Sequence, residues 1–64
     1  MPAQFEIVEP EGDEGWRWRL VAGNGEIVCA SEGYASAFNA ERGVDDMVRV
    51  AIAAHRQPFV QVTK

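Results

Sequence analysis

The sequence predicts an α+β domain in which a three-stranded antiparallel meander is followed by one helix packed across it and by a C-terminal strand (β-β-β-α-β). Three observations lead to this prediction. Apolar and polar residues alternate near the N-terminus, an Asn-Gly turn joins two apolar segments, and apolar residues recur every three or four positions from Ala37 onward. The 64 residues form one domain at most, spanning 1–64.

The first strand is predicted over Gln4–Val8, because Phe5 and Ile7 share one face of an alternating segment. The next residues, Glu9–Gly15, contain proline, glycines and four carboxylates, which is typical of a solvated turn. This acidic run lacks the alternating oxygen ligands and the terminal Glu of a calcium loop, so it predicts no metal site.

A hairpin is predicted around Asn24 and Gly25, which are expected to form a two-residue type I′ turn. This turn pairs Gly23 with Glu26. Counting back gives the pairs Ala22–Ile27, Val21–Val28, Leu20–Cys29, Arg19–Ala30, Trp18–Ser31 and Arg17–Glu32. The expected core face of the hairpin carries Trp16, Trp18, Leu20, Ile27 and Cys29. The opposite face carries Arg17, Arg19, Val21, Val28, Ala30 and Glu32.

The helix is expected to begin after an N-cap at Ser36, whose hydroxyl can accept a free amide of the first turn. It should end by His55 or Arg56, because Pro58 cannot continue a helix. Gly43 costs about 1 kcal/mol relative to alanine inside a helix, and we attribute it to a close approach of the helix to the sheet. The apolar stripe of the helix is formed by Ala37, Ala40, Val44, Met47, Val48, Ala51 and Ile52.

The whole chain is expected to pack around a small apolar core. The predicted core consists of Phe5, Ile7, Trp16, Trp18, Leu20, Ile27, Cys29, Val44, Met47, Val48 and Ala51.

The last segment, residues 58–64, reads as a strand that either closes its own sheet or crosses to another subunit. A chain this short buries only about 60% of the surface that its unfolded form exposes. Cys29 is the single cysteine, so the chain has no internal disulfide, and one Cys with one His cannot supply a structural zinc site. We therefore favour a second subunit, and predict a homodimer.

Charge and motifs argue against several classes of function. The net charge of −4 repels phosphate backbones, so nucleic-acid binding is disfavoured. A core position is predicted for Cys29 and a helix-end position for His55, so neither is assigned a catalytic role, and no cofactor is predicted. The chain shows neither a membrane span nor a signal peptide, which together with the free thiol predicts a cytoplasmic protein.

Two alternatives are kept for the function. One is a nucleic-acid or anionic-ligand binder that uses the outward residues Arg17 and Arg19. The other is a small-molecule site at the dimer interface, lined by Trp18 and Tyr34.

The order of motifs resembles that of the YegP-like family of small bacterial and archaeal proteins. The matching residues are Phe5–Ile7, Trp16–Leu20, Asn24–Val28, Ser31–Tyr34 and Glu41–Val44. The resemblance implies a β-β-β-α-β unit that occurs as tandem repeats or as homodimers, forming a joint sheet with exchanged C-terminal strands, and it implies no catalytic residues. The sequence departs from the family pattern after Met47, where the helix looks longer. The leading hypothesis is a small homodimeric structural or interaction module without enzymatic activity.

Overall fold

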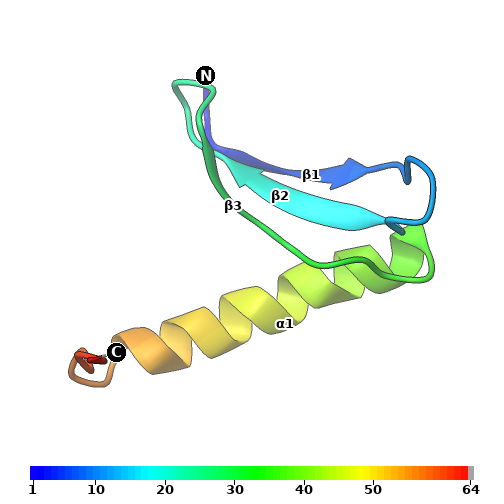
Figure 1. Ribbon diagram of the computed structural model, residues 1–64. Coiled ribbons are helices and arrows are strands. Elements are labelled where there is room, and N and C mark those ends of the chain that lie inside the picture. Colours follow the sequence, from blue (N-terminus) through cyan, green and yellow to red (C-terminus); the bar gives the residue numbers. More distant parts are fainter. Residues whose placement is uncertain (64) are drawn as a thin grey trace.

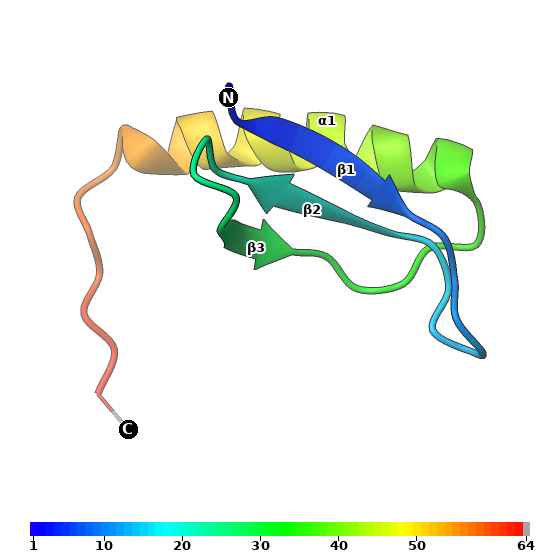
Figure 2. The same ribbon diagram turned by 90° about the horizontal axis from the view of Figure 1, so that it is seen from above.

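The computed structural model describes residues 1–63 and consists of a three-stranded sheet and one long helix. The strands are β1 (Gln4–Val8), β2 (Arg17–Val21) and β3 (Ile27–Ala30), and the helix is α1 (Ala37–His55). Strand β2 lies in the centre and pairs antiparallel with both neighbours. The helix crosses one face of the sheet (Figure 1, Figure 2). The predicted α+β class, the meander and the helix that follows it are confirmed.

The pairing of β1 with β2 separates an apolar face from a charged face. Phe5 lies opposite Leu20 and Ile7 lies opposite Trp18, so these side chains share one face. The rings of Phe5 and Trp18 meet edge to face, with centroids 5.8 Å apart. Helix α1 covers this face and packs on β1 and β2. Arg19 lies on the opposite face, so the predicted inward tryptophan and outward arginine of β2 are confirmed.

The hairpin tip differs from the predicted two-residue turn. The amide of Ala22 donates to the carbonyl oxygen of Glu26 at 2.8 Å, and the amide of Gly25 donates to the carbonyl oxygen of Ala22 at 2.9 Å. The loop therefore holds three residues, 23–25. Gly25 has a φ of 89° but Asn24 has a negative φ, which excludes a type I′ turn. A left-handed glycine closing a three-residue loop is a common alternative connection. The predicted Gly23–Glu26 pair is therefore wrong.

A β-bulge at Val28 restores the predicted register further along the hairpin. Val21 pairs with Ile27 and Leu20 pairs with Cys29, so Val28 is an extra residue on β3. Because Ile27 lies opposite Val21, it stands on the charged face of the sheet, whereas the sequence placed it in the core. The structure confirms the predicted pairs Leu20–Cys29 and Arg19–Ala30. It corrects the predicted pairs Ala22–Ile27 and Val21–Val28.

Helix α1 begins and ends where the sequence predicts. The Ser36 hydroxyl accepts a hydrogen bond from the amide of Asn39 at 3.0 Å, which satisfies a free donor of the first turn. The last helical residue is His55, Arg56 is the C-cap, and Pro58 follows two residues later.

The buried core is smaller than predicted. Trp18 is 6% exposed and Ala40 is fully buried, and Gly43 is buried beside them. Five predicted core residues are half-buried: Ile7, Trp16, Leu20, Val44 and Met47. The other five are exposed: Phe5, Ile27, Cys29, Val48 and Ala51. The reason is that α1 diverges from the sheet towards its C-terminal end and makes no contact with β3 (Figure 1).

The predicted C-terminal strand does not form within the single chain. Residues 58–63 are exposed, carry no strand and make no main-chain hydrogen bond to the rest of the described chain. They leave the end of α1 and run away from it, far from the edges of the sheet (Figure 2). A strand exists only beside a hydrogen-bonded neighbour, and none is within reach. Lys64, the last residue of the predicted strand, lies outside the described residues.

Candidate functional site

The four residues singled out from the sequence lie in different places. Trp18 and Tyr34 line one hollow between α1 and the β3 side of the sheet. Arg19 lines a second hollow on the opposite face of the sheet. Arg17 lines neither. The structure therefore brings the two aromatic residues together and separates them from the arginines.

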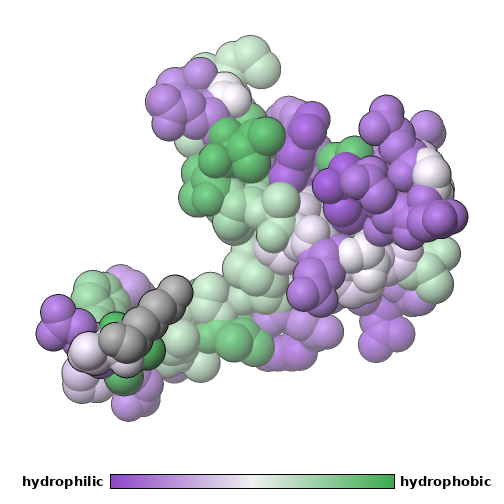
Figure 3. All heavy atoms as spheres, viewed as in Figure 1, coloured by the Kyte–Doolittle hydropathy of each residue, from purple (hydrophilic) through white to green (hydrophobic). Residues whose placement is uncertain are grey.

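The first hollow, which we call the helix-side hollow, has a volume of about 480 Å³. Its residues come from β2, from β3 and the segment after it, and from the middle of α1. They are Trp18, Ala30, Ser31, Glu32, Tyr34, Gly43, Asp46, Met47 and Val50. Apolar side chains line the gap between sheet and helix, as Figure 3 shows. Two carboxylates, those of Glu32 and Asp46, stand among them.

Reciprocal main-chain hydrogen bonds hold Tyr34 at the wall of this hollow. The amide of Trp16 donates to the Tyr34 carbonyl oxygen at 2.9 Å, and the Tyr34 amide donates to that of Trp16 at 2.6 Å. The chains meet so closely here that a Cβ at Gly15 would lie 2.9 Å from the Tyr34 carbonyl oxygen, and one at Gly33 would overlap the main chain of Glu14. The two glycines therefore let the bridge form, and the bridge positions the tyrosine.

Hydrogen bonds to Ser31 fix the position of Trp18. The Ser31 amide donates to the Trp18 carbonyl oxygen at 2.9 Å, and the Trp18 amide donates to the Ser31 hydroxyl at 2.9 Å. The indole Nε1 of Trp18 is covered by the chain and has no hydrogen-bond partner within residues 1–63. Trp18 thus forms part of the wall of the hollow, although its side chain is largely covered.

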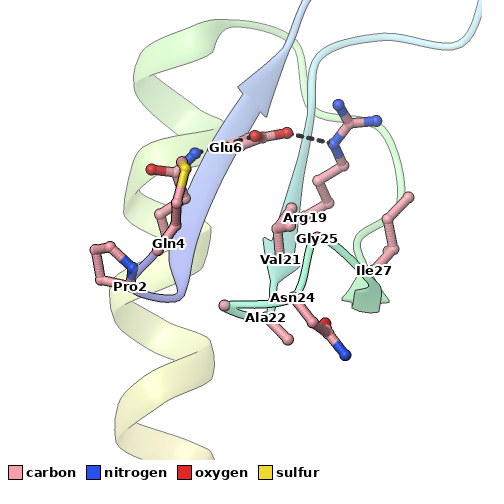
Figure 4. Close-up of a pocket in the computed structure, with 11 residues that line it drawn as sticks. Pro2, Gln4, Glu6, Arg19, Val21, Ala22, Asn24, Gly25 and Ile27 are labelled. Carbon is pink, nitrogen blue, oxygen red and sulfur yellow. Dashed lines mark hydrogen bonds and ion pairs between the residues drawn. The ribbon is translucent and has the colours of Figure 1, made fainter.

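The second hollow, which we call the outward hollow, has a volume of about 460 Å³ and lies on the charged face (Figure 4). Arg19 Nε donates to Glu6 Oε1 at 2.7 Å, and Gln4 Nε2 donates to Glu6 Oε2 at 3.2 Å. The hydrogen bond from Arg19, followed by the one from Gln4, holds the pKa of Glu6 below its usual value. Val21 and Ile27 supply an apolar wall beside this ion pair.

Both arginines of β2 have carboxylate partners. Arg19 is paired with Glu6, and an Arg17 Nη atom lies 3.8 Å from a carboxylate oxygen of Glu14, not beside Glu32 as the predicted register implied. The charged face is therefore a set of ion pairs and not a free cationic patch, and such a surface attracts a phosphate backbone weakly.

The remaining reactive side chains stand apart from one another. Cys29 is exposed on β3, contrary to its predicted core position, because the helix does not reach that strand. His55 ends α1. Within residues 1–63, no three His, Cys, Asp or Glu side chains gather in a way that could hold a metal ion. No helix in the same range has the length and apolar character needed to cross a membrane.

Two features of these hollows were missed in the sequence. Met47 was expected in the core but lines the helix-side hollow, and Val50 was not singled out at all. The helical periodicity could have revealed Val50, which follows Met47 on the same side of α1. The outward position of Ile27 depends on the bulge at Val28, for which the sequence carries no local signal.

The single chain is far from compact. It exposes 5416 Å², whereas a compact protein of 7.1 kDa exposes about 4,100 Å². Its radius of gyration is 13.6 Å, against about 10.7 Å for a compact domain of this length. Large apolar side chains are exposed mainly on β3, on the second half of α1 and on residues 59–62.

Comparisons with known proteins give a family and a fold. The model of the family described as "Domain of unknown function (DUF1508)" matches residues 12–57. UPF0339 protein NMB1088 of Neisseria meningitidis serogroup B and UPF0339 protein NMA1193/NMA1859 of serogroup A are each 46% identical over 41 residues, which cover 64% of this chain and 71% of theirs.

A solved structure agrees over nearly the whole chain. It is the NMR solution structure of a protein from Haloferax volcanii, 34% identical, which covers 95% of this chain and 97% of its own with a TM-score of 0.72. The likeness therefore includes the helix and most of the segments on either side of the matched domain.

Proposed function

We propose a function for this chain, which belongs to the DUF1508 family, in agreement with its resemblance to YegP-like proteins. The description of that family names no activity, so the function is inferred from the surface of the molecule. The chain acts as a homodimeric interaction module in which the C-terminal segment of each copy completes the sheet and core of the other. We assign it no catalytic role, and we place it in the cytoplasm, where a free thiol such as Cys29 persists.

The observation that carries the proposal is the excess of exposed surface. The chain exposes about 1,300 Å² more than a compact protein of its mass. A stable interface of ordinary size covers about 800 Å² per partner. The excess is therefore enough for an extensive interface, and it is apolar where β3 and the second half of α1 lack any cover.

The C-terminal segment has the properties of the missing partner element. Phe59, Val60 and Val62 are 90%, 84% and 80% exposed, although each is apolar. The edge of β3 has unpaired main-chain groups, and the helix-side hollow lies next to it. A strand from a second copy would satisfy the main-chain groups and bury these side chains, as exchanged elements do in other dimers. The exchanged strand implied by the family resemblance agrees with this arrangement.

The test is the mass of the protein in solution, measured by light scattering after size exclusion across a dilution series. The full chain should have the mass of a dimer. Truncation after Gln57 should shift it to monomer or unfold it, and so should the double substitution Val60→Asp with Val62→Asp. The double substitution Val60→Ile with Val62→Ile keeps the apolar character of the same two side chains and should leave the dimer intact.

Two results would overturn this proposal. One is a full chain that stays monomeric at every concentration while its circular dichroism shows the complete α+β content. The other is a dimer that survives both the truncation and the paired valine substitutions, because its interface would then lie elsewhere.

A second candidate function is a small-molecule site in the helix-side hollow. It is favoured by one observation, the meeting of Trp18 and Tyr34 in a hollow of about 480 Å³, which is a usual size for ligand pockets. The Trp16→Phe variant leaves Trp18 as the single reporter of fluorescence. If no class of metabolite changes its emission or the melting temperature, this candidate is rejected. Nucleic-acid binding through Arg17 and Arg19 has no such support, because both are paired with carboxylates.

A further inference from the structure

The outward hollow lies on the face of the sheet that α1 does not cover, so the interface proposed above leaves it unexplained. We propose that it binds a small organic carboxylate with an apolar body, such as a short-chain fatty acid. The carboxylate would bind the guanidinium of Arg19, and the apolar body would lie against Ile27 and Val21.

The orientation of Arg19 leaves one side of its guanidinium free. Its Nε is bound to Glu6 Oε1 at 2.7 Å, and the other oxygen of Glu6 accepts from Gln4, so the guanidinium is held from one side. Figure 4 shows its two Nη atoms on the side away from Glu6. Neither has a hydrogen-bond partner within residues 1–63. A guanidinium presents five N–H groups in a planar fork, so the free Nη groups can still bind a second carboxylate.

Ile27 and Val21 form an apolar wall beside this guanidinium. Ile27 is 57% exposed beside Val21, on the face of the sheet that also carries Arg19 and Glu6. It stands there because Val28 bulges out of the ladder and turns Ile27 to the same side as Val21. Bulges often redirect a side chain at a binding site. An exposed apolar side chain beside an oriented cation suits a ligand that has both characters.

The size and charge of the hollow narrow the class of ligand that it can bind. A volume of about 460 Å³ accommodates a small molecule. Arg19 supplies the one cationic side chain among the described residues that line it, Met1 with the N-terminal amine also lines it, and the carboxylate of Glu6 lies beside Arg19. A polyanion such as a nucleic acid would meet repulsion there, whereas a single carboxylate needs only the free side of one guanidinium. The hollow is open to solvent, and a solvent-exposed ion pair contributes little binding energy. We therefore expect a Kd of about 1 mM.

The experiment is an NMR titration of the full chain with hexanoate at pH 7 and constant ionic strength. The Arg19 Nε–H and Ile27 δ-methyl signals should shift together and saturate with a Kd of about 1 mM. Hexanol and hexylamine, which share the apolar body without the carboxylate, should bind at least tenfold more weakly. Arg19→Gln and Ile27→Asn should each abolish the saturable shift. Arg17→Gln, on the same strand and face but outside the hollow, should leave it unchanged.

Several outcomes would overturn the proposal independently of the oligomeric state. If hexanoate causes no saturable shift at a concentration about 20-fold above that Kd, the site is rejected. Equal shifts with hexylamine would reject carboxylate recognition. Persistence of the shift in Ile27→Asn, which keeps the Arg19–Glu6 pair, would reject the apolar wall. Contacts from a second protomer to Ile27 in a mixed-label sample would show that the dimer already fills the hollow.

Discussion

The phenol ring of Tyr34 lies directly against the main chain of Gly43 in α1. A Cβ at position 43 would stand 2.5 Å from Cζ of the ring and even closer to the hydroxyl oxygen. From the sequence we attributed Gly43 to a close approach of the helix to the sheet. In the structure the close neighbour is the ring of Tyr34, a residue that the Trp16–Tyr34 bridge holds in place. This contact joins the end of the meander to the middle of the helix.

Gly43→Ala should destabilise the protein by up to about 2 kcal/mol. Alanine improves helix propensity by about 1 kcal/mol, but overpacking against a fixed ring costs about 1–3 kcal/mol. Urea denaturation at one fixed chain concentration measures the change. The double variant with Tyr34→Leu should recover part of the loss, because the ring is then gone. A gain in stability for the single variant would mean that the ring moves aside freely.

Gly25→Ala should cost about 1–2 kcal/mol, because position 25 has a φ of 89° and L-residues rarely adopt that conformation. The space around a Cβ there is open, so the cost is one of main-chain conformation alone. Gly25→Asn should cost less, since asparagine tolerates the left-handed region. Equal losses in the two variants would contradict this explanation. Thermal and urea unfolding of the matched pair make the comparison.

Ser36→Ala should destabilise the protein by about 1 kcal/mol through loss of the N-cap. The hydroxyl accepts the amide of Asn39, and alanine leaves that donor to solvent. Ser36→Asp preserves an acceptor at the same place and should keep most of the stability. If alanine and aspartate behave alike, the cap makes no contribution. The measurement is the urea midpoint together with helical circular dichroism.

The Glu6–Arg19 pair should make stability depend on pH in the acidic range. The pKa of Glu6 is lowered in the folded chain, first by the hydrogen bond from Arg19. Its contribution is therefore complete above the ordinary glutamate pKa of about 4.3 and is lost as the pH falls through the lower folded value. Glu6→Gln should be less stable than the parent at pH 7, and the two should converge as the pH falls below the lowered folded-state pKa of Glu6. A difference that stays constant with pH would show that the charge of Glu6 has no effect.

The sequence was sufficient where neighbouring residues determine the structure. The alternation in β1 and β2 indicates both strands and their inward faces, and Ser36 and Pro58 bracket α1 correctly. These features depend on side-chain periodicity, capping and the missing amide of proline, all of which are local.

The sequence was insufficient where distant segments determine the structure. Cys29 lies opposite Leu20 as predicted, yet it is exposed, because burial depends on the direction that α1 takes after Gly43. The candidate residues Trp18 and Tyr34 were found, but their neighbours Met47 and Val50 depend on the same direction. The sequence around Asn24 is compatible with a two-residue and a three-residue hairpin loop, and the chain forms the three-residue loop. The bulge at Val28 then restores the predicted pairing of Leu20 with Cys29.

The bulge at Val28 also allows the hairpin tip to change in length without shifting the rest of the sheet. Ile27 pairs before it and Cys29 pairs after it, so deletion of Val28 would leave a continuous ladder with both partners unchanged. Insertions and deletions between Val21 and Cys29 can thus be absorbed in steps of one residue, while Trp18 and the segment leading to Tyr34 keep their positions. The loop and the outward hollow can therefore change in length without altering the side of the sheet that meets the helix.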